Sequence, residues 1–270
     1  MHDEAGGLGD RGDLIERVDA IDPTFAAGVE HLGRVIHQDG RLSARTKSLI
    51  AAATTAVRDP AALPIAVATA FEFGNVAEDL RAVALTLYLS RGVPPCRDLL
   101  DAVDAIDGID AHGADAAADA STSGQAARAS VAPVTVAEVV AEFASVFGTV
   151  PDRVNLLVEH CPDGLAAYHY MRVAGLSDGS LEPLDAELIL MAVNAAEHRG
   201  DFAAVHAAGA RRQGATEPQL VEAGLVAVQS GGVAAWLAAA EAIVSTRPTP
   251  TAAYTTEPPP SSATSATTTG

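Results

Sequence analysis

The apolar positions of the chain recur with a helical period, and strand-like alternation of apolar and polar residues is nearly absent. Leu184, Leu188, Ala192 and Ala195 follow Pro183 at intervals of three and four residues, which is typical of one face of an α-helix. Proline is tolerated in a first helical turn, so we expect this helix to begin at the proline. The pattern predicts an all-α protein.

Two further helices are predicted C-terminal to this one. Gly200 interrupts the pattern, and the next helix carries His206 and ends before Gly214, the usual glycine position beyond a helix. Thr216 and Gln219 then form a Thr-x-x-Gln capping box in front of another apolar run. The glycine- and alanine-rich stretch that follows is predicted to be the last helix.

The composition favours closely packed helices. Apolar residues make up 49% of the chain but aromatic residues only 4%, so the core must consist mainly of Ala, Val and Leu. Alanine loses no side-chain entropy on folding and has the highest helix propensity. This supports the all-α prediction.

Two parts of the chain resemble each other. Residues 39–50, "DGRLSARTKSLI", align with residues 178–189, "DGSLEPLDAELI", at a constant offset of 139. The offset becomes 140 after one inserted residue, and it then pairs the turn glycines Gly74 with Gly214 and Gly92 with Gly232. Shared glycines and apolar positions are what a duplicated helical scaffold would keep, so we predict a tandem repeat.

The duplication divides the chain into five segments. The first repeat spans residues 13–107 and the second spans residues 134–245. Residues 108–133, rich in Gly, Ser, Asp and Ala and without periodicity, are predicted to form a flexible linker. Residues 1–12 and the Pro/Ser/Thr-rich residues 246–270 are predicted to be disordered.

Charge and cysteine content exclude several classes of protein. The formal net charge is −18, and the 17 basic residues are scattered among 35 acidic ones, which disfavours a nucleic-acid partner. The start, "MHDEAGGLGDRGD", lacks the pattern of a signal peptide, and no apolar run reaches the roughly 18 residues of a membrane span. Cys96 and Cys161 form no disulfide framework, so we expect a cytoplasmic protein.

The second repeat carries a recognisable order of motifs. A helix with Glu187 is followed by His-x-x-x-Ala-x-x-x-Gly at residues 206–214, and then by a capped helix that ends at a glycine pair. This arrangement resembles the carboxymuconolactone decarboxylase family, which also contains the alkylhydroperoxidase D-like proteins. The resemblance covers residues 152–244 well and residues 13–107 only as a scaffold. It implies the all-α fold of that family.

One branch of this family reduces peroxides with a Cys-x-x-Cys pair just before the histidine. Carried onto this sequence, the two cysteine positions fall on Arg199 and Phe202. Peroxide reduction of this kind needs an attacking thiolate and a resolving thiol, and neither Cys96 nor Cys161 has a cysteine neighbour. The peroxidase function is therefore disfavoured.

The decarboxylase branch keeps the histidine without the cysteine pair, and resemblance to it implies a cofactor-free lyase acting on a small anionic lactone or keto acid. An imidazole can transfer a proton near neutral pH, so His206 is the predicted acid–base residue, with Glu187 orienting it. A guanidinium can hold a substrate carboxylate through paired hydrogen bonds. The predicted substrate-binding residues are Arg199, Phe202, Arg211 and Arg212.

Other interpretations stay open at this point. The first repeat has Ser48 and Ala66 at the glutamate and histidine positions, which favours a non-catalytic, oligomeric or small-molecule-binding protein as an alternative. His206 could also be an inert helix histidine. His160, Cys161 and His169 lie close in sequence, but a metal site needs more converging ligands, so neither a metal nor a cofactor is predicted. Family members assemble from single repeats, which implies a homo-oligomer, a dimer or a trimer of this chain.

Overall fold

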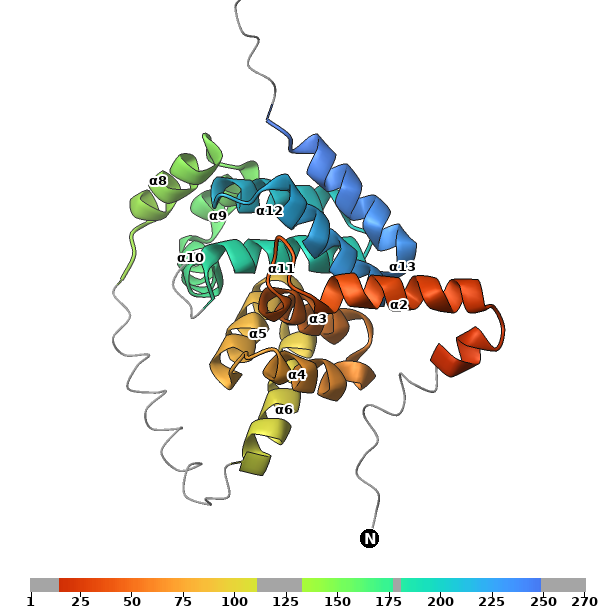
Figure 1. Cartoon of the computed structure of the whole chain (residues 1–270). Helices are drawn as coiled ribbons and strands as arrows, with labels where there is room; N and C mark the ends of the chain where they lie inside the picture. The colour runs from red at the N-terminus through yellow and green to blue at the C-terminus, as the bar shows by residue number, and fades with distance from the viewer. Residues whose placement is uncertain (1–14, 111–132, 177–180, 249–270) are drawn as a thin grey trace, which may run out of the picture.

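The computed structural model describes residues 15–110, 133–176 and 181–248, and within these residues it contains helices and no strand (Figure 1). The all-α prediction is confirmed. The first half contains α2 (Pro23–His37), α3 (Ala44–Arg58), a short 3-10 helix (Pro60–Ala62), α4 (Leu63–Glu72), α5 (Ala77–Arg91) and α6 (Val93–Asp110). The second half contains α8 (Val136–Phe147), α9 (Asp152–His160), α10 (Pro162–Leu176), α11 (Pro183–Ala196), α12 (Gly200–Arg212) and α13 (Glu217–Ser245).

The local sequence explains where the site-bearing helices begin and end. Pro183 is the first residue of α11, as predicted. Gly214, with φ of +91°, follows α12 and lets the chain turn where a side chain would be strained. Thr216 and Gln219 form the predicted capping box, in which the Thr216 backbone N–H donates to Gln219 Oε1 over 2.9 Å.

Helix α13 is a hairpin of two arms rather than one straight helix. Gly232 has a non-helical backbone with φ of +70° and ψ of −174°. A β-carbon on Gly224 would lie 2.8 Å from Cβ of Ala239, so the arm before Gly232 packs closely against the arm after it. Gly92, with φ of +76°, separates α5 from α6 in the same way.

The length and hydropathy of α13 differ from one expectation from the sequence. Residues Glu217–Ser245 are long and apolar enough to cross a membrane by length and composition alone, contrary to the expected absence of such a segment. Because the chain turns back at Gly232, neither arm reaches the roughly 20 residues that a spanning helix needs. Helix α13 packs against α11, α12 and α3.

Helices α2–α6 of the first half and helices α10–α13 of the second half follow the same order. Helix α2 maps onto α10 at both ends with the offset of 139, and α3 and α11 begin at equivalent residues. Helices α4 and α12 end at equivalent residues with the offset of 140, and α5 and α6 correspond to the two arms of α13. The predicted duplication stays a prediction, and these matched boundaries support it.

The predicted segment boundaries differ in part from the helix ends. Helix α6 continues to Asp110, past the expected start of the linker at residue 108. The rest of that linker, residues 111–132, lies outside the described residues, as do residues 1–14 and 249–270.

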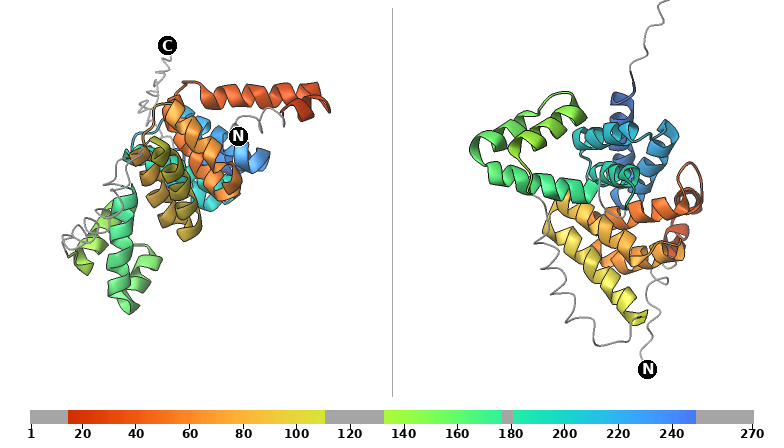
Figure 2. Two further views of the ribbon diagram at one scale, coloured as in Figure 1. Left: turned by 90° about the horizontal axis from the view of Figure 1, so that it is seen from below. Right: turned by 90° about the vertical axis from the view of Figure 1, so that its left-hand side faces the viewer.

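The halves pack across each other. Helices α3 and α11 are in contact near the centre, while α2 crosses to pack on α13 and α10 crosses to pack on α5 (Figures 1 and 2). The main core is built from Ala, Val, Leu and Ile, as the composition predicts, and it runs continuously from one half into the other. Each half therefore completes the burial of the other, which is where most of the stabilisation of a helical protein arises.

Helices α8 and α9 stand to one side of this core against α10 (Figure 2, right). Thr135 Oγ1 caps α8 by accepting a hydrogen bond from the Glu138 N–H, and Glu138 Oε2 accepts one from the Thr135 N–H. A separate small core of Val139, Phe143, Val154 and Leu165 holds the three helices together. This arrangement gives the second half an additional wall.

Candidate functional site

The structure brings Glu187 and His206 together. Glu187 lies on α11 and His206 on the following helix α12, and the imidazole Nδ1 lies 2.8 Å from Oε2 of the carboxylate. The His206 side chain is 19% exposed and that of Glu187 is 13% exposed, so the pair is mostly shielded from water. A hydrogen bond from Nδ1–H to the carboxylate fixes the orientation of the ring and does not use the other ring nitrogen, Nε2.

The absence of a side chain at Gly209 makes room for this pair. Gly209 lies one helical turn after His206 on α12 and is buried. A β-carbon at this position would overlap the Glu187 carboxylate. The glycine therefore lets the carboxylate lie flat against α12, within reach of the imidazole.

The imidazole forms part of the wall of a cavity of about 300 Å³. Its walls come from the end of α5, from α8–α10, and from α11 and α12, so it lies where the two halves meet. Its polar lining residues, other than His206 and Ser90, are Arg91, Arg153, Tyr168, Arg172, Asn194 and Arg199. Four guanidinium groups beside one imidazole give this cavity a local positive charge in a chain whose net charge is −18.

Two of the predicted substrate-binding residues, Arg199 and Phe202, line this cavity. The Arg199 guanidinium carbon lies 4.2 Å from the centre of the Phe202 ring, within the range of a cation–π contact. The Arg199 side chain is 42% exposed and has Glu197 as a distant ion-pair partner at 3.9 Å. Its charge therefore remains available to a ligand in the cavity.

Residues 162–244 match the model of the Carboxymuconolactone decarboxylase family. This segment is a carboxymuconolactone decarboxylase family domain. It contains α10–α12 and almost all of α13, with both members of the Glu187–His206 pair. No curated protein matches the chain.

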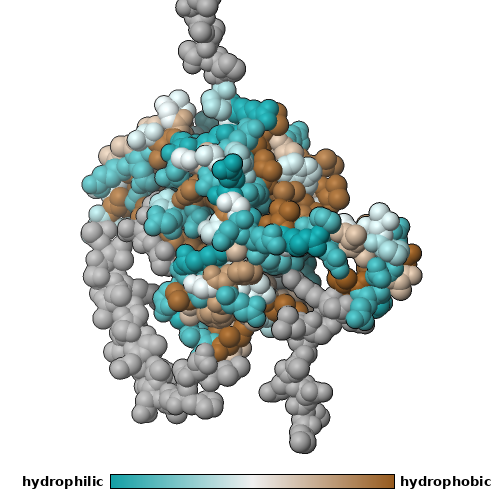
Figure 3. All heavy atoms as spheres, viewed as in Figure 1, coloured by the Kyte–Doolittle hydropathy of each residue, from teal (hydrophilic) through white to brown (hydrophobic). Residues whose placement is uncertain are grey.

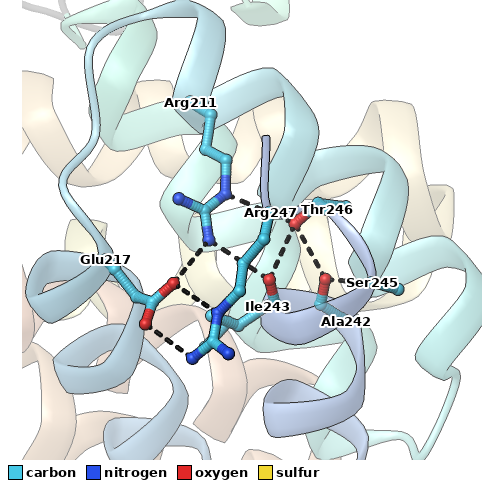
Figure 4. Close-up of polar contacts among 7 residues, drawn as sticks. All are labelled: Arg211, Glu217, Ala242, Ile243, Ser245, Thr246 and Arg247. Atoms are coloured by element: carbon cyan, nitrogen blue, oxygen red, sulfur yellow. Dashed lines mark hydrogen bonds and ion pairs between the residues drawn. The ribbon is translucent and has the colours of Figure 1, made fainter. Parts of the chain in front are cut away.

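Arg211 serves another purpose in the family domain. It does not line the cavity, and its Nη2 group donates to Glu217 Oε2 over 3.2 Å and to the carbonyl oxygen of Ile243 over 3.1 Å (Figure 4). Arg247 binds the same carboxylate, and Thr246 accepts from Nε of Arg211 over 3.4 Å. These contacts connect the end of α12 to both ends of the α13 hairpin, so the Arg211 guanidinium stabilises the packing of these helices.

Arg212 also lies outside the cavity lining. It is exposed, and its guanidinium carbon lies 5.6 Å from the centre of the Phe147 ring, which does line the cavity. Arg153 and Arg172 lie 5.5 Å from the same ring. Arg212 therefore adds positive charge behind the α8 wall without reaching the cavity.

The sequence did not single out the cavity residues Arg91, Arg153, Arg172 and Asn194. Arg91 belongs to the first half, which lies outside the family match, and Arg153 lies on α9 before that match begins. Asn194 lies within the apolar face of α11, where it is 1% exposed, so the surrounding pattern indicates a core position. A polar residue at a buried helix position is the one sequence signal that could have found it.

The first half has no acid–base pair at the equivalent positions. Ser48 Oγ donates to the Arg45 carbonyl oxygen and accepts from Asn75 Nδ2 over 2.8 Å, and Ala66 is buried. Thr69 stands at the position equivalent to Gly209. The first half has Ser48 at the glutamate position, so a β-carbon on Thr69 has no equivalent of the Glu187 carboxylate to overlap.

The two cysteines lie outside the cavity lining. Cys96 is buried on α6, and burial raises the pKa of its thiol, which disfavours a nucleophilic thiolate. Cys161 is exposed between α9 and α10. His169 Nδ1 lies 3.1 Å from Glu142 Oε2, and within the described part of the chain no three His, Cys, Asp or Glu side chains are grouped as metal ligands.

Proposed function

We propose that the family domain is a cofactor-free acid–base enzyme, lyase-like, that acts on a small anionic lactone or keto acid. The observation that carries this proposal is the His206 imidazole, held by Glu187 over 2.8 Å and lining a cationic cavity. A cavity of about 300 Å³ suits a small ligand. The cofactor-free character follows the resemblance to the decarboxylase branch.

The reaction needs a proton at carbon after carbon dioxide has left. The bond between the ring carbon and the carboxylate breaks, and its electron pair enters the conjugated lactone. His206 in its protonated form then donates the Nε2 proton to carbon, which completes the product. Glu187 accepts the Nδ1–H throughout, so it keeps the ring oriented and stabilises the protonated imidazole.

The guanidinium groups supply the electrostatic part of catalysis. Arg199, Arg153 and Arg172 line the cavity and attract a substrate carboxylate out of water. Among the described residues, the acidic partner of Arg172 is Glu142, at the long distance of 4.0 Å. Positive charge that is fixed in place before the substrate arrives stabilises developing negative charge without reorganisation.

The test is decarboxylation by the full-length protein of a panel of small lactone and keto carboxylic acids labelled with carbon-13. Release of labelled carbon dioxide by the wild type should fall about a hundredfold or more in His206→Gln, because general acid–base catalysis contributes that much. His37→Gln changes a histidine in the first half and serves as the matched control, with unchanged turnover. Equal turnover by wild type and His206→Gln would overturn the mechanism.

A non-catalytic function has its own signature in the same experiment. The empty pair positions Ser48 and Ala66 favour a binding protein as the second candidate. Saturable binding of panel members without any release of carbon dioxide would support that candidate and exclude the lyase. The predicted assembly as a dimer or trimer and the predicted cytoplasmic location stay predictions.

A further inference from the structure

The end of helix α5 of the first half lines the cavity that also contains His206 in its wall. Arg91 is its last residue, and Gly92, with φ of +76°, stops the helix there. The Arg91 side chain is only 10% exposed and lines the cavity. Burying a charge is unfavourable without partners. A buried arginine on a cavity wall is therefore expected to have partners in the protein or in a ligand.

The guanidinium of Arg91 is held in a fixed orientation by three neighbours. Nη2 donates to Asn194 Oδ1 over 2.8 Å, and Nη1 donates to the carbonyl oxygen and the Oγ of Ser90. Nε forms an ion pair with Glu197. Asn194 is itself fixed, since its Nδ2 donates to the Leu190 carbonyl oxygen over 2.7 Å.

These partners leave one N–H of the Arg91 guanidinium free within the described part of the chain. A guanidinium has five N–H groups, and the second N–H of Nη2 has no partner among the described residues. Glu197 also lies 3.9 Å from Arg199, so one carboxylate faces two guanidinium groups. The group of Arg91, Glu197 and Arg199 therefore keeps a net positive charge beside the cavity.

The contribution runs in one direction only. The residue equivalent to Arg91 in the second half is Gly231, where a β-carbon would lie 2.7 Å from the Ala196 carbonyl oxygen. An arginine side chain therefore does not fit at position 231, and the second half does not supply an equivalent guanidinium to the first half. This asymmetry matches that of the Glu187–His206 pair, whose equivalent positions in the first half hold Ser48 and Ala66.

We propose that Arg91 is an anion-binding residue of the second half's cavity, so that the site is composite and the first half is retained because it supplies this guanidinium. This proposal rests on the small-anion ligand of the proposed function but not on turnover. The anionic group recognised is a carboxylate, placed between Arg91 and the imidazole of His206. The first half would then act within the chain as a binding partner of the family domain.

Succinate binding by the full-length protein tests this assignment, with titration calorimetry for the dissociation constant and thermal unfolding for stability. Losing a hydrogen bond between charged groups weakens binding about ten- to a hundredfold. We expect that loss in Arg91→Met, and a smaller loss in Arg91→Lys, which keeps the charge without the planar fork. Arg81→Met is the matched control, because Arg81 is another ion-paired arginine of α5, bound to Asp104 and Asp107 and outside the cavity.

The outcomes separate binding from a purely structural role. Arg91 variants that melt earlier but bind succinate as the wild type does would overturn the proposal, as would a wild type that does not bind succinate. A structural connection alone predicts a loss of stability that Arg81→Met shares, with unchanged affinity. Succinate binding that depends on Arg91 in a protein without decarboxylase activity would uphold this proposal and refute only the lyase function.

Discussion

The two halves of the molecule place a hollow at equivalent positions and line it with different chemistry. In the second half, Tyr168 and Arg172 of α10 line the cavity of about 300 Å³. Their equivalents in α2, Val29 and Gly33, line a hollow of about 870 Å³ between α2 and α13. Hydrophobic residues gather on the surface over α13 near α2 (Figure 3).

The two halves have the same order of helices but differ in the side chains that surround each hollow. Helices α8 and α9 cover α10 beside the smaller cavity. The equivalent helix of the first half, α2, is less covered, and its Phe25 remains 65% exposed. The pair positions hold Glu187 and His206 in one half and Ser48 and Ala66 in the other. The halves therefore differ in these few side chains although their helices follow the same order, and the proposed function depends on the side chains.

The largest expected effect concerns Lys47, a buried lysine of the first half that forms an ion pair with Glu222 of the second half. Lys47 is 1% exposed, and its Nζ lies 2.9 Å from Glu222 Oε2 on α13 and donates to the carbonyl oxygens of Val35 and Gln38. Removing one partner of a buried pair leaves an uncompensated charge, so Lys47→Met should lower the free energy of unfolding by about 3–5 kcal/mol. Urea denaturation measures this.

The equivalent position in the second half provides the control. Ala186 is buried and carries no charge, so Ala186→Ser should cost less than Lys47→Met. A loss below about 1 kcal/mol in Lys47→Met would show that Lys47 does not join the halves.

Stability should also depend on pH through Glu222. Burial opposes its ionisation, but hydrogen bonds from the Arg41 and Leu42 N–H groups and from Lys47 outweigh this and lower the pKa of Glu222. A lowered folded-state pKa gives stability that is present above the ordinary glutamate value of about 4.3 and is lost as the pH falls below it. Urea midpoints between pH 7 and pH 3 should fall less steeply in Glu222→Gln than in the wild type; equal slopes would contradict the assignment.

The next largest expected effect concerns Gly209, which makes room for the Glu187–His206 pair. Gly209→Ala should push the Glu187 carboxylate away from His206, because a β-carbon would overlap it. We expect decarboxylation to fall at least about tenfold, since the acid–base group loses its orientation. Nitrogen-15 NMR of His206 should show the loss of the Nδ1 hydrogen bond.

A double-mutant cycle makes this prediction specific. In a Glu187→Ala background Gly209→Ala should have little further effect on turnover, because the displaced group is already gone. Thr69→Ala, at the equivalent position of α4, should leave turnover unchanged. Additive losses from Glu187→Ala and Gly209→Ala would contradict the proposed role of the glycine.

The smallest expected effect lies at the cavity mouth. Phe202 is 53% exposed and contacts Arg199 through its ring. An exposed cation–π contact contributes about 0.5–1 kcal/mol, so Phe202→Ala should weaken succinate binding about two- to fivefold. Phe202→Tyr keeps the ring and should bind as the wild type does. Equal affinities of the alanine and tyrosine variants would show that the ring does not position Arg199.

The candidate site was predictable where its signals are local. The period of α11 and the capping box of α13 could be read from neighbouring residues, and the motif order around residues 206–214 led to Glu187 and His206. Arg211 shows the limit, because a cation in a last helical turn looks free in the sequence. Its partners Glu217 and Ile243 become visible only when the α13 hairpin is folded back.

The sequence by itself determined the helices, their caps, the turn glycines and the family of the second half, because each depends on residues a few positions apart. Only the tertiary structure decided which cations face the cavity. Arg91 and Asn194 meet across 103 positions of sequence, and that meeting depends on how α5 crosses α11. Contacts between helices depend on packing of the whole core, which no local pattern specifies, so the composite nature of the site emerges only in the folded chain.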